Sequence, residues 1–197
     1  MDDGHSRQDR PREREPAFDP APLIVTLLLD PESQARFDRL RSLHFPPERN
    51  FLAAHVTLFH HLPPERADVI AADLAAVASP TERFTVSATG LHSLGRGTAF
   101  RLDSEHLIRL RGTLARRWED QLTAQDRQGF RPHVTIQNKV TAEAAKRLLG
   151  LLSAEFSPFQ VTAVGLGLWR YRGGPWDAAG SFAFIGPPAD LPERPRR

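Results

Sequence analysis

Apolar residues between positions 23 and 186 gather into alternating segments of strand length and helix length. Residues 23–29 are a continuous apolar run, which predicts a buried strand. Asp30, Pro31 and Glu32 follow in the order typical of a helix start, with a capping carboxylate and a proline at the first helical position. The same criteria predict further strands at residues 55–59, 84–90, 98–102, 133–136, 159–166 and 181–185, and further helices at residues 65–78, 104–122 and 142–152.

The second half of the chain repeats the plan of the first half. Residues 159–166 (Phe-Gln-Val-Thr-Ala-Val-Gly-Leu) match residues 84–91 (Phe-Thr-Val-Ser-Ala-Thr-Gly-Leu) almost position for position. Two His-Val-Thr motifs, at residues 55–57 and 133–135, precede these segments by 29 and 26 residues, and a Leu-Asp pair ends the first predicted strand of each half. A duplicated strand-helix-strand-helix-strand unit explains all three coincidences.

This repeat sets the expected domain organisation. Units at about residues 23–91 and 98–186 each have too few strands to be stable alone, so we expect one domain over residues 23–186 whose two lobes pack with approximate two-fold symmetry. Residues 1–22 and 187–197 mix charges with Pro and show no apolar periodicity, which predicts a disordered arm and a disordered tail.

Composition narrows the possible chemistry. The 197 residues include no cysteine, which excludes disulfides, thiolate catalysis and cysteine-ligated zinc. No apolar stretch approaches the roughly 18 residues of a membrane span and the N-terminus is charged, so a cytoplasmic location is predicted. The formal net charge is only +2, but residues 96–147 hold eleven Lys or Arg against six Asp or Glu. This segment favours an anionic ligand without implying extended DNA binding.

The two His-Val-Thr motifs carry the candidate chemistry. Side chains alternate along a strand, so His55 and Thr57 point the same way, and so do His133 and Thr135. Eight His and eleven Thr predict about 0.4 His-x-Thr matches by chance, and the apolar neighbours lower this number further. If the lobes face each other, two imidazoles and two hydroxyls meet in one cleft. One histidine then removes a proton from the attacking oxygen and the other protonates the leaving oxygen of a phosphate ester, with the threonines on the phosphoryl oxygens.

The paired His55-Val-Thr-Leu58 and His133-Val-Thr-Ile136 segments resemble the defining motifs of the 2H phosphoesterase superfamily, in its 2′-5′ RNA ligase-like branch. The resemblance spans about residues 23–186. It implies a bilobal α+β fold in which antiparallel-rich sheets line a central cleft and helices lie outside. It also implies a metal-independent 2′,3′-cyclic phosphodiesterase that leaves a 2′-phosphate on a nucleotide or RNA, with reversible 2′-5′ ligation as a related activity. By resemblance, His55 and His133 are the acid/base pair and Thr57 and Thr135 bind the phosphate.

Several neighbouring side chains are candidates for substrate binding. Many members of the branch have a basic residue where this chain has Asn138, so Lys139 is the nearest candidate cation, with a solvated strand end as the alternative. A segment with aromatic residues and arginines, 168–176, is either a rim that stacks on a base or an ordinary hairpin. Strand alternation and this segment together give the candidate substrate-binding residues Phe59, His61, Gln137, Lys139, Trp169 and Tyr171, of which Phe59 also suits a core position.

Other features leave the reaction and its partners partly open. The His60-His61 pair does not predict a metal site, because adjacent strand residues face opposite ways. His44, His92 and His106 have no evident partner, and we expect neither a metal nor a cofactor. RNA 2′-5′ ligation and a non-catalytic RNA-binding module remain alternatives. The sequence leaves undecided the physiological substrate, which histidine is the acid, and the oligomeric state, for which a monomer is the default.

Overall fold

Eight strands and five α-helices make up residues 18–189, which are the residues described by a computed structural model. The predicted arm and tail fall largely on residues 1–17 and 190–197, outside the described residues. The strands are β1 (Leu23–Leu29), β2 (Val56–Leu62), β3 (Glu82–Ser93), β4 (Thr98–Asp103), β5 (His133–Gln137), β6 (Phe159–Tyr171), β7 (Trp176–Ala183) and β8 (Ile185–Ala189). The helices are α1 (Pro31–His44), α2 (Ala67–Ala78), α3 (Glu105–Arg117), α4 (Ala124–Arg127) and α5 (Ala142–Ala154), with 3₁₀ turns η1 (Pro47–Arg49), η2 (Pro64–Arg66) and η3 (Glu119–Gln121).

Helix starts follow the capping signals in the sequence. Asp30 accepts hydrogen bonds from the backbone N–H groups of Glu32 at 3.0 Å and Ser33 at 3.1 Å, and Pro31 occupies the first position of α1. The side chains of Ser104 and Thr141 cap α3 and α5 in the same way. No helix within residues 18–189 is long and apolar enough to cross a membrane.

Some elements differ in length from their predictions. The helix predicted at residues 104–122 ends at Arg117, where buried Trp118 donates its indole N–H to Asp73 at 2.9 Å and the chain turns into η3. The structure also corrects the predicted tail, because residues 187–189 belong to β8. That strand pairs in parallel with β3, and its first residue, Ile185, donates its backbone N–H to the carbonyl of Thr81.

The strand order shows the repeat in three dimensions. Six strands follow the order β2-β1-β6-β3-β4-β5, with β7 added beside β6 and β8 beside β3. In the central pair Val86 lies opposite Val161, which is its equivalent in the repeat. The first three strands in the chain, β1, β2 and β3, correspond to β4, β5 and β6. Replacing each strand by its counterpart turns the order into its own reverse, as two-fold symmetry requires. Since β6 pairs with β1 and β3 pairs with β4, each lobe contains a strand from the other half of the chain.

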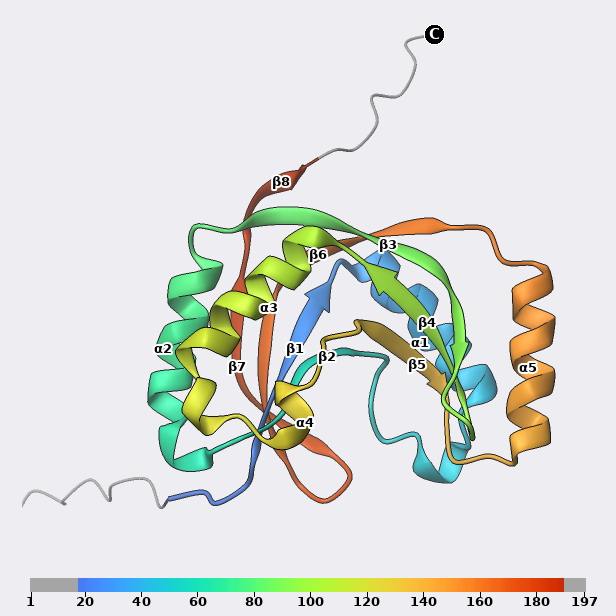
Figure 1. Ribbon diagram of the computed structural model, residues 1–197, viewed down its shortest axis with the longest axis horizontal. Helices are drawn as coiled ribbons and strands as arrows, with labels where there is room; N and C mark the ends of the chain where they lie inside the picture. Colours follow the sequence, from blue (N-terminus) through green and yellow to red (C-terminus); the bar gives the residue numbers. More distant parts are fainter. Residues whose placement is uncertain (1–17, 190–197) are drawn as a thin grey trace, which may run out of the picture.

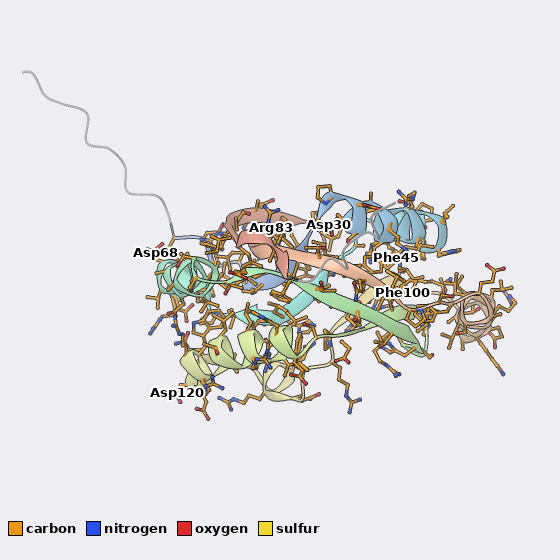
Figure 2. The ribbon with its side chains drawn as sticks, turned by 90° about the horizontal axis from the view of Figure 1, so that it is seen from above. Asp30, Phe45, Asp68, Arg83, Phe100 and Asp120 are labelled. Atoms are coloured by element: carbon orange, nitrogen blue, oxygen red, sulfur yellow. The ribbon has the colours of Figure 1, made fainter. Side chains whose placement is uncertain are left out.

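Curvature of the sheet brings the two ends of this strand order together. Figure 1 shows β3 and β6 arching across the top of the molecule, with β2 and β5 beneath them. β2 and β5 contact each other although they occupy opposite ends of the strand order. In Figure 2, α1, between Asp30 and Phe45, and α3, which ends shortly before Asp120, lie on opposite sides of the centre, as do α2 and α5.

The hydrophobic core joins the two lobes. Phe37 of α1 is fully buried and packs edge-on against Phe100 of β4, with ring centroids 5.5 Å apart. The ring of Phe159 at the start of β6 lies 5.8 Å from that of Phe37. Because α1, β4 and β6 come from both halves of the chain, neither half retains this core without the other.

Candidate active site

The two motif histidines enter their strands with the same local geometry. His55 directly precedes β2, and His133 is the first residue of β5. The Nδ1 atom of each lies 2.9 Å from a carbonyl oxygen two residues earlier, that of Ala53 for His55 and that of Arg131 for His133. Because a carbonyl oxygen only accepts, Nδ1 carries the hydrogen in both rings. Each Nε2 atom is thus left to exchange a proton with a ligand.

The motif threonines are placed alike and are followed by the same irregularity. Thr57 and Thr135 are half-buried and pair with Thr26 and Ala99 on the neighbouring strands. One extra residue is then inserted in each motif strand, since the next partners in register are Phe59 and Gln137. A β-bulge therefore follows each His-Val-Thr motif and reverses which face the later side chains occupy.

Two cavities adjoin the histidines, and their chemical character differs. A cavity of about 540 Å³ lies beside His55 and is lined mostly by apolar residues of β1, the loop before His55 and two tryptophans, Trp169 and Trp176. A cavity of about 280 Å³ lies beside His133 and includes Thr57 from the other motif. The remaining residues of this second cavity are mainly polar or cationic: Leu58, His60, His92, Arg111, Gln125, Asp126, Gln128, Gly129, Phe130 and Arg131.

Burial makes the two motif histidines electrostatically unequal. The ring of Trp176 lies 4.6 Å from that of His55. Burial lowers the pKa of His55 to about 4; the hydrogen bond to the carbonyl of Ala53 opposes this change, and positive charge on Arg41 and His133 adds to it. His55 is thus neutral near pH 7, with Nε2 as a proton acceptor.

Arg41 is a site-forming residue that the sequence did not reveal. It is only 5 % exposed, and its guanidinium donates to the side-chain oxygen of Asn50 at 2.8 Å, the carbonyl of Leu52 at 3.0 Å and the carbonyl of Thr135 at 2.9 Å. It therefore fastens α1 and the loop before His55 to the other motif strand. A lone Arg on the inward face of a helix is the only signal for it in the sequence.

The bulge in β2 displaces two predicted substrate-binding residues. Phe59 is fully buried, packs edge-on against Trp118 at 5.0 Å and therefore does not line the cleft. His61 is exposed and lies outside the lining of both cavities. His60 takes the place expected for His61 and lines the cavity beside His133. The prediction for these positions requires uninterrupted alternation along β2, and the residue inserted after Thr57 breaks it.

The bulge in β5 has the same effect on the second motif strand. Gln137 is buried, and its side-chain oxygen has no hydrogen-bond partner within the described residues. Lys139 is exposed, lies just after β5 and has a φ of 63°, a left-handed turn conformation that ends the strand. Neither residue lines the two cavities beside the histidines.

The predicted aromatic rim is split. Trp169 lines the larger cavity and donates its indole N–H to the hydroxyl of Thr26 at 2.8 Å. Tyr171 is 42 % exposed and lies outside both cavities. Trp176, at the end of the segment 168–176, is the aromatic residue that contacts His55. The segment 168–176 therefore supplies two tryptophans to the surroundings of His55.

His60 has a structural partner in α4. Its Nδ1 lies 3.0 Å from a carboxylate oxygen of Asp126, which also accepts the backbone N–H groups of His60 and His61. Asp126 is 2 % exposed and fixes α4 against β2. Residues 18–189 contain no cluster of three His, Asp or Glu side chains suited to a metal ion.

His92 is a further residue of the site that the sequence left without a role. β3 continues past Gly90 to Ser93, where a strand ending at Gly90 was predicted, and so carries His92 into the cavity beside His133. The His92 and His133 rings lie 5.6 Å apart and nearly perpendicular. The pairing with β4 has one extra residue of β3 between Ala88 and Gly90, so the alternation of Phe84, Val86 and Ala88 does not extend to His92 and could not place it.

Comparisons with known proteins agree with this arrangement. The sequence pattern of the 2′-5′ RNA ligase superfamily matches residues 29–175. A crystal structure of E. coli LigT with 3′-AMP aligns over 85% of this chain and 100% of its own, at 18% identity and a TM-score of 0.57. The protein TT0787 of Thermus thermophilus aligns over 83% and 97%, at 17% identity and a TM-score of 0.59. A structure described as a phosphoesterase aligns over 85% and 100%, at 19% identity and a TM-score of 0.57.

A comparison with curated protein sequences finds no match. At these identities the solved structures show the fold, and this fold confirms the α+β arrangement predicted from the sequence. The family pattern covers most of the chain and includes both His-Val-Thr motifs. The chain belongs to the 2′-5′ RNA ligase superfamily, among the 2H phosphoesterases.

Proposed function

We propose that this protein hydrolyses 2′,3′-cyclic phosphates, or related 2′-linked esters, of nucleotides or RNA without a metal ion. The observation that carries the proposal is the matched pair of imidazoles, each with Nδ1 bonded to a carbonyl and Nε2 left for proton transfer. Two such groups provide both proton transfers of a phosphoester hydrolysis. The superfamily includes phosphoesterases and ligases, and the cyclic phosphodiester is the substrate that we assign to this member.

The unlike surroundings of the two histidines support different roles for them. His55 is neutral near pH 7 because burial lowers its pKa to about 4, so its Nε2 removes a proton from the attacking water. The water oxygen forms a bond to phosphorus, the bond from phosphorus to the 3′-oxygen breaks, and His133 donates its Nε2 proton to that oxygen. The products are a 2′-phosphate monoester and a free 3′-hydroxyl. Thr57 and Thr135 hold the phosphoryl oxygens during this exchange.

The two cavities suggest how the ester is oriented. The apolar cavity beside His55 has about the size of a small-ligand site and presents Trp169 and Trp176, which suit stacking with a nucleobase. The cavity beside His133 presents Arg111 and Arg131, which suit the phosphate side of the substrate. LigT, which has the same fold, has been crystallised with 3′-AMP, NADP+ and ATP, and a nucleotide ligand is consistent with these two cavities.

The test is hydrolysis of adenosine 2′,3′-cyclic phosphate and of a short RNA ending in a cyclic phosphate, with a chelator present. Wild type should release the 2′-phosphate, and His133→Ala should lower kcat by about 10²- to 10⁴-fold. His106→Ala is the matched control, because His106 stacks on Phe84 and lines neither cavity. Loss of turnover with chelator, or full activity of His133→Ala, would contradict the mechanism.

The same assay separates hydrolysis from its alternatives. Incubation of the cyclic-phosphate RNA with a second RNA bearing a 5′-hydroxyl tests the reverse reaction, because a 2′-5′ linkage then forms at the same site. A non-catalytic RNA-binding protein would release no product and would bind with a steep dependence on salt.

A further inference from the structure

A third histidine, His92, lines the cavity beside His133, and its Nδ1 atom makes no hydrogen bond within residues 18–189. His92 lies on β3, opposite Ala99 of β4, in a part of the sheet that is continuous with the second motif strand. Its ring is nearly perpendicular to that of His133, at a centroid distance of 5.6 Å. It shares the cavity of about 280 Å³ with Thr57 and His133, so it lies where both motifs meet.

The hydrogen-bonding pattern of His92 is the reverse of that of the motif histidines. His55 and His133 have Nδ1 bonded to a carbonyl, which fixes the hydrogen on Nδ1. In His92 it is Nδ1 that is enclosed by protein, and it has no partner in the described part of the chain. A hydrogen on that enclosed nitrogen has no acceptor. In the neutral ring it therefore resides on Nε2.

We propose that His92 is a neutral hydrogen-bond donor to the substrate, giving its Nε2–H to a non-bridging phosphoryl oxygen held between Thr57 and His133. The inference rests on the proposed function and adds a substrate-binding residue to it. The two motif histidines exchange protons, whereas His92 keeps its proton and contacts the negative charge on the phosphoryl group.

The charges around His92 favour a neutral ring. Burial lowers its pKa, and the positive charges of His133 on β5 and Arg101 on β4 lower it further. Arg111 and Arg131 line the same cavity, and its one carboxylate, Asp126, is engaged by His60 and by backbone N–H groups. A further cation beside Arg111 and Arg131 would be repelled by them. A neutral N–H donor adds an interaction with the phosphate without adding a charge to the cavity.

The repeat shows that this donor belongs to one lobe only. In the alignment of residues 84–91 with 159–166, the position equivalent to His92 is Gly167 on β6. A Cβ atom at Gly167 would lie 2.8 Å from the indole nitrogen of Trp169, so that space holds a tryptophan. The donor is consequently present beside His133 and absent beside His55.

Two substitutions separate a donor from a proton-transfer group and from a packing role. His92→Gln keeps an N–H donor near the position of Nε2 and cannot titrate, whereas His92→Phe keeps an aromatic ring and removes the donor. We expect His92→Phe to lower kcat/KM for the cyclic phosphate by about 10- to 100-fold, and His92→Gln to stay within about threefold of wild type. Both variants should keep the pH profile of wild type. The control is His106→Gln, outside this cavity and stacked on Phe84 of the same sheet.

Each other outcome overturns the proposal. If kcat/KM falls equally in both variants and one limb of the pH profile is missing, His92 acts as an acid or a base. Wild-type rates in both variants would mean that His92 does not contact the substrate. Two measurements do not depend on turnover: ¹⁵N NMR of the histidine rings, which must show His92 protonated on Nε2 alone at pH 7, and titration with adenosine 2′-monophosphate, which must bind more weakly to His92→Phe than to His92→Gln. If wild type fails to hydrolyse the cyclic phosphate, the proposed function fails, and these two measurements still decide the role of His92.

Discussion

The surroundings of His55 and His133 start from the same plan and end with different chemistry. Each histidine bonds a carbonyl two residues earlier, each is followed by a threonine, and each motif strand has a bulge directly after that threonine. Yet a tryptophan covers His55, whereas another imidazole faces His133. The duplicated backbone thus gives the two histidines the same local geometry, and the unlike side chains around them give each ring a different environment.

A small difference in sequence separates the two environments. Gly167 leaves room for Trp169, which bonds Thr26 and packs against Trp176 at a ring distance of 6.2 Å. Trp176 in turn covers His55. In the other lobe, His92 occupies the position equivalent to Gly167 and lines a polar cavity. The difference between Gly167 and His92 at this one position of the repeat therefore accompanies an apolar environment at His55 and a polar environment at His133.

The largest expected effect comes from removing each motif histidine in turn. His55→Ala and His133→Ala should each lower kcat by about 10³-fold on a 2′,3′-cyclic phosphate, and the double variant should lose little more, because the two groups act as a unit. A cyclic substrate in which sulfur replaces the leaving 3′-oxygen distinguishes the acid from the base. A thiolate leaves without protonation, so activity should return to His133→Ala and not to His55→Ala. Return of activity in His55→Ala instead would exchange the two roles.

The next effect is expected on the side of His133, through the buried carboxylate that holds α4. Asp126 accepts hydrogen bonds from the ring and backbone of His60 and from the backbone of His61, and the segment after it carries the Arg131 carbonyl that orients His133. Asp126→Asn replaces an acceptor by a group that also donates, and it should lower the free energy of unfolding in urea by about 3 kcal/mol. His55 should keep its pKa in this variant, as measured by NMR.

The pH dependence of stability follows from the same carboxylate. Burial opposes ionisation of Asp126, but the hydrogen bonds from His60 and His61 outweigh it, so its pKa is lowered. A pKa lower in the folded than in the unfolded chain gives stability that is present above about pH 4 and lost as the pH falls through the folded value. Urea unfolding at pH 7 and pH 3 should therefore show a smaller difference between wild type and Asp126→Asn at pH 3. An equal difference at both values would contradict this origin.

A smaller effect is expected from uncovering His55. Trp176→Ala exposes the ring to water, so the pKa of His55 should rise from about 4 toward its ordinary value of 6.5. Since His55 must be neutral to accept a proton, the acidic limb of the kcat/KM profile should move to higher pH, by about one unit. Tyr171→Ala is a suitable control because Tyr171 is exposed and outside both cavities. An unmoved limb would mean that another group sets it.

The sequence predicted the strands, helices and motifs that form this site better than the residues that line its cavities. The order of strands and helices, the repeat and both His-Val-Thr motifs can be inferred from apolar periodicity and from similarity within the chain, since local patterns determine them. His61 and Gln137 were misplaced because a bulge depends on pairing with another strand, which periodicity along one strand does not show. Arg41 and His92 were missed for a related reason: the curvature of the sheet brings them to the motifs from elements distant in sequence.

The smallest predicted effect tests the packing that separates the two lobes. Trp169→Phe removes the donor to the hydroxyl of Thr26, which is 2 % exposed, and should lower the free energy of unfolding by about 1 kcal/mol. Thr26→Val should cost a similar amount, because the indole N–H then loses its acceptor. The double variant, with both polar groups gone, should be less destabilised than the sum of the two single variants. A purely additive result in urea unfolding would mean that the indole acts by filling the space left by Gly167, and that its hydrogen bond contributes little to the environment of His55.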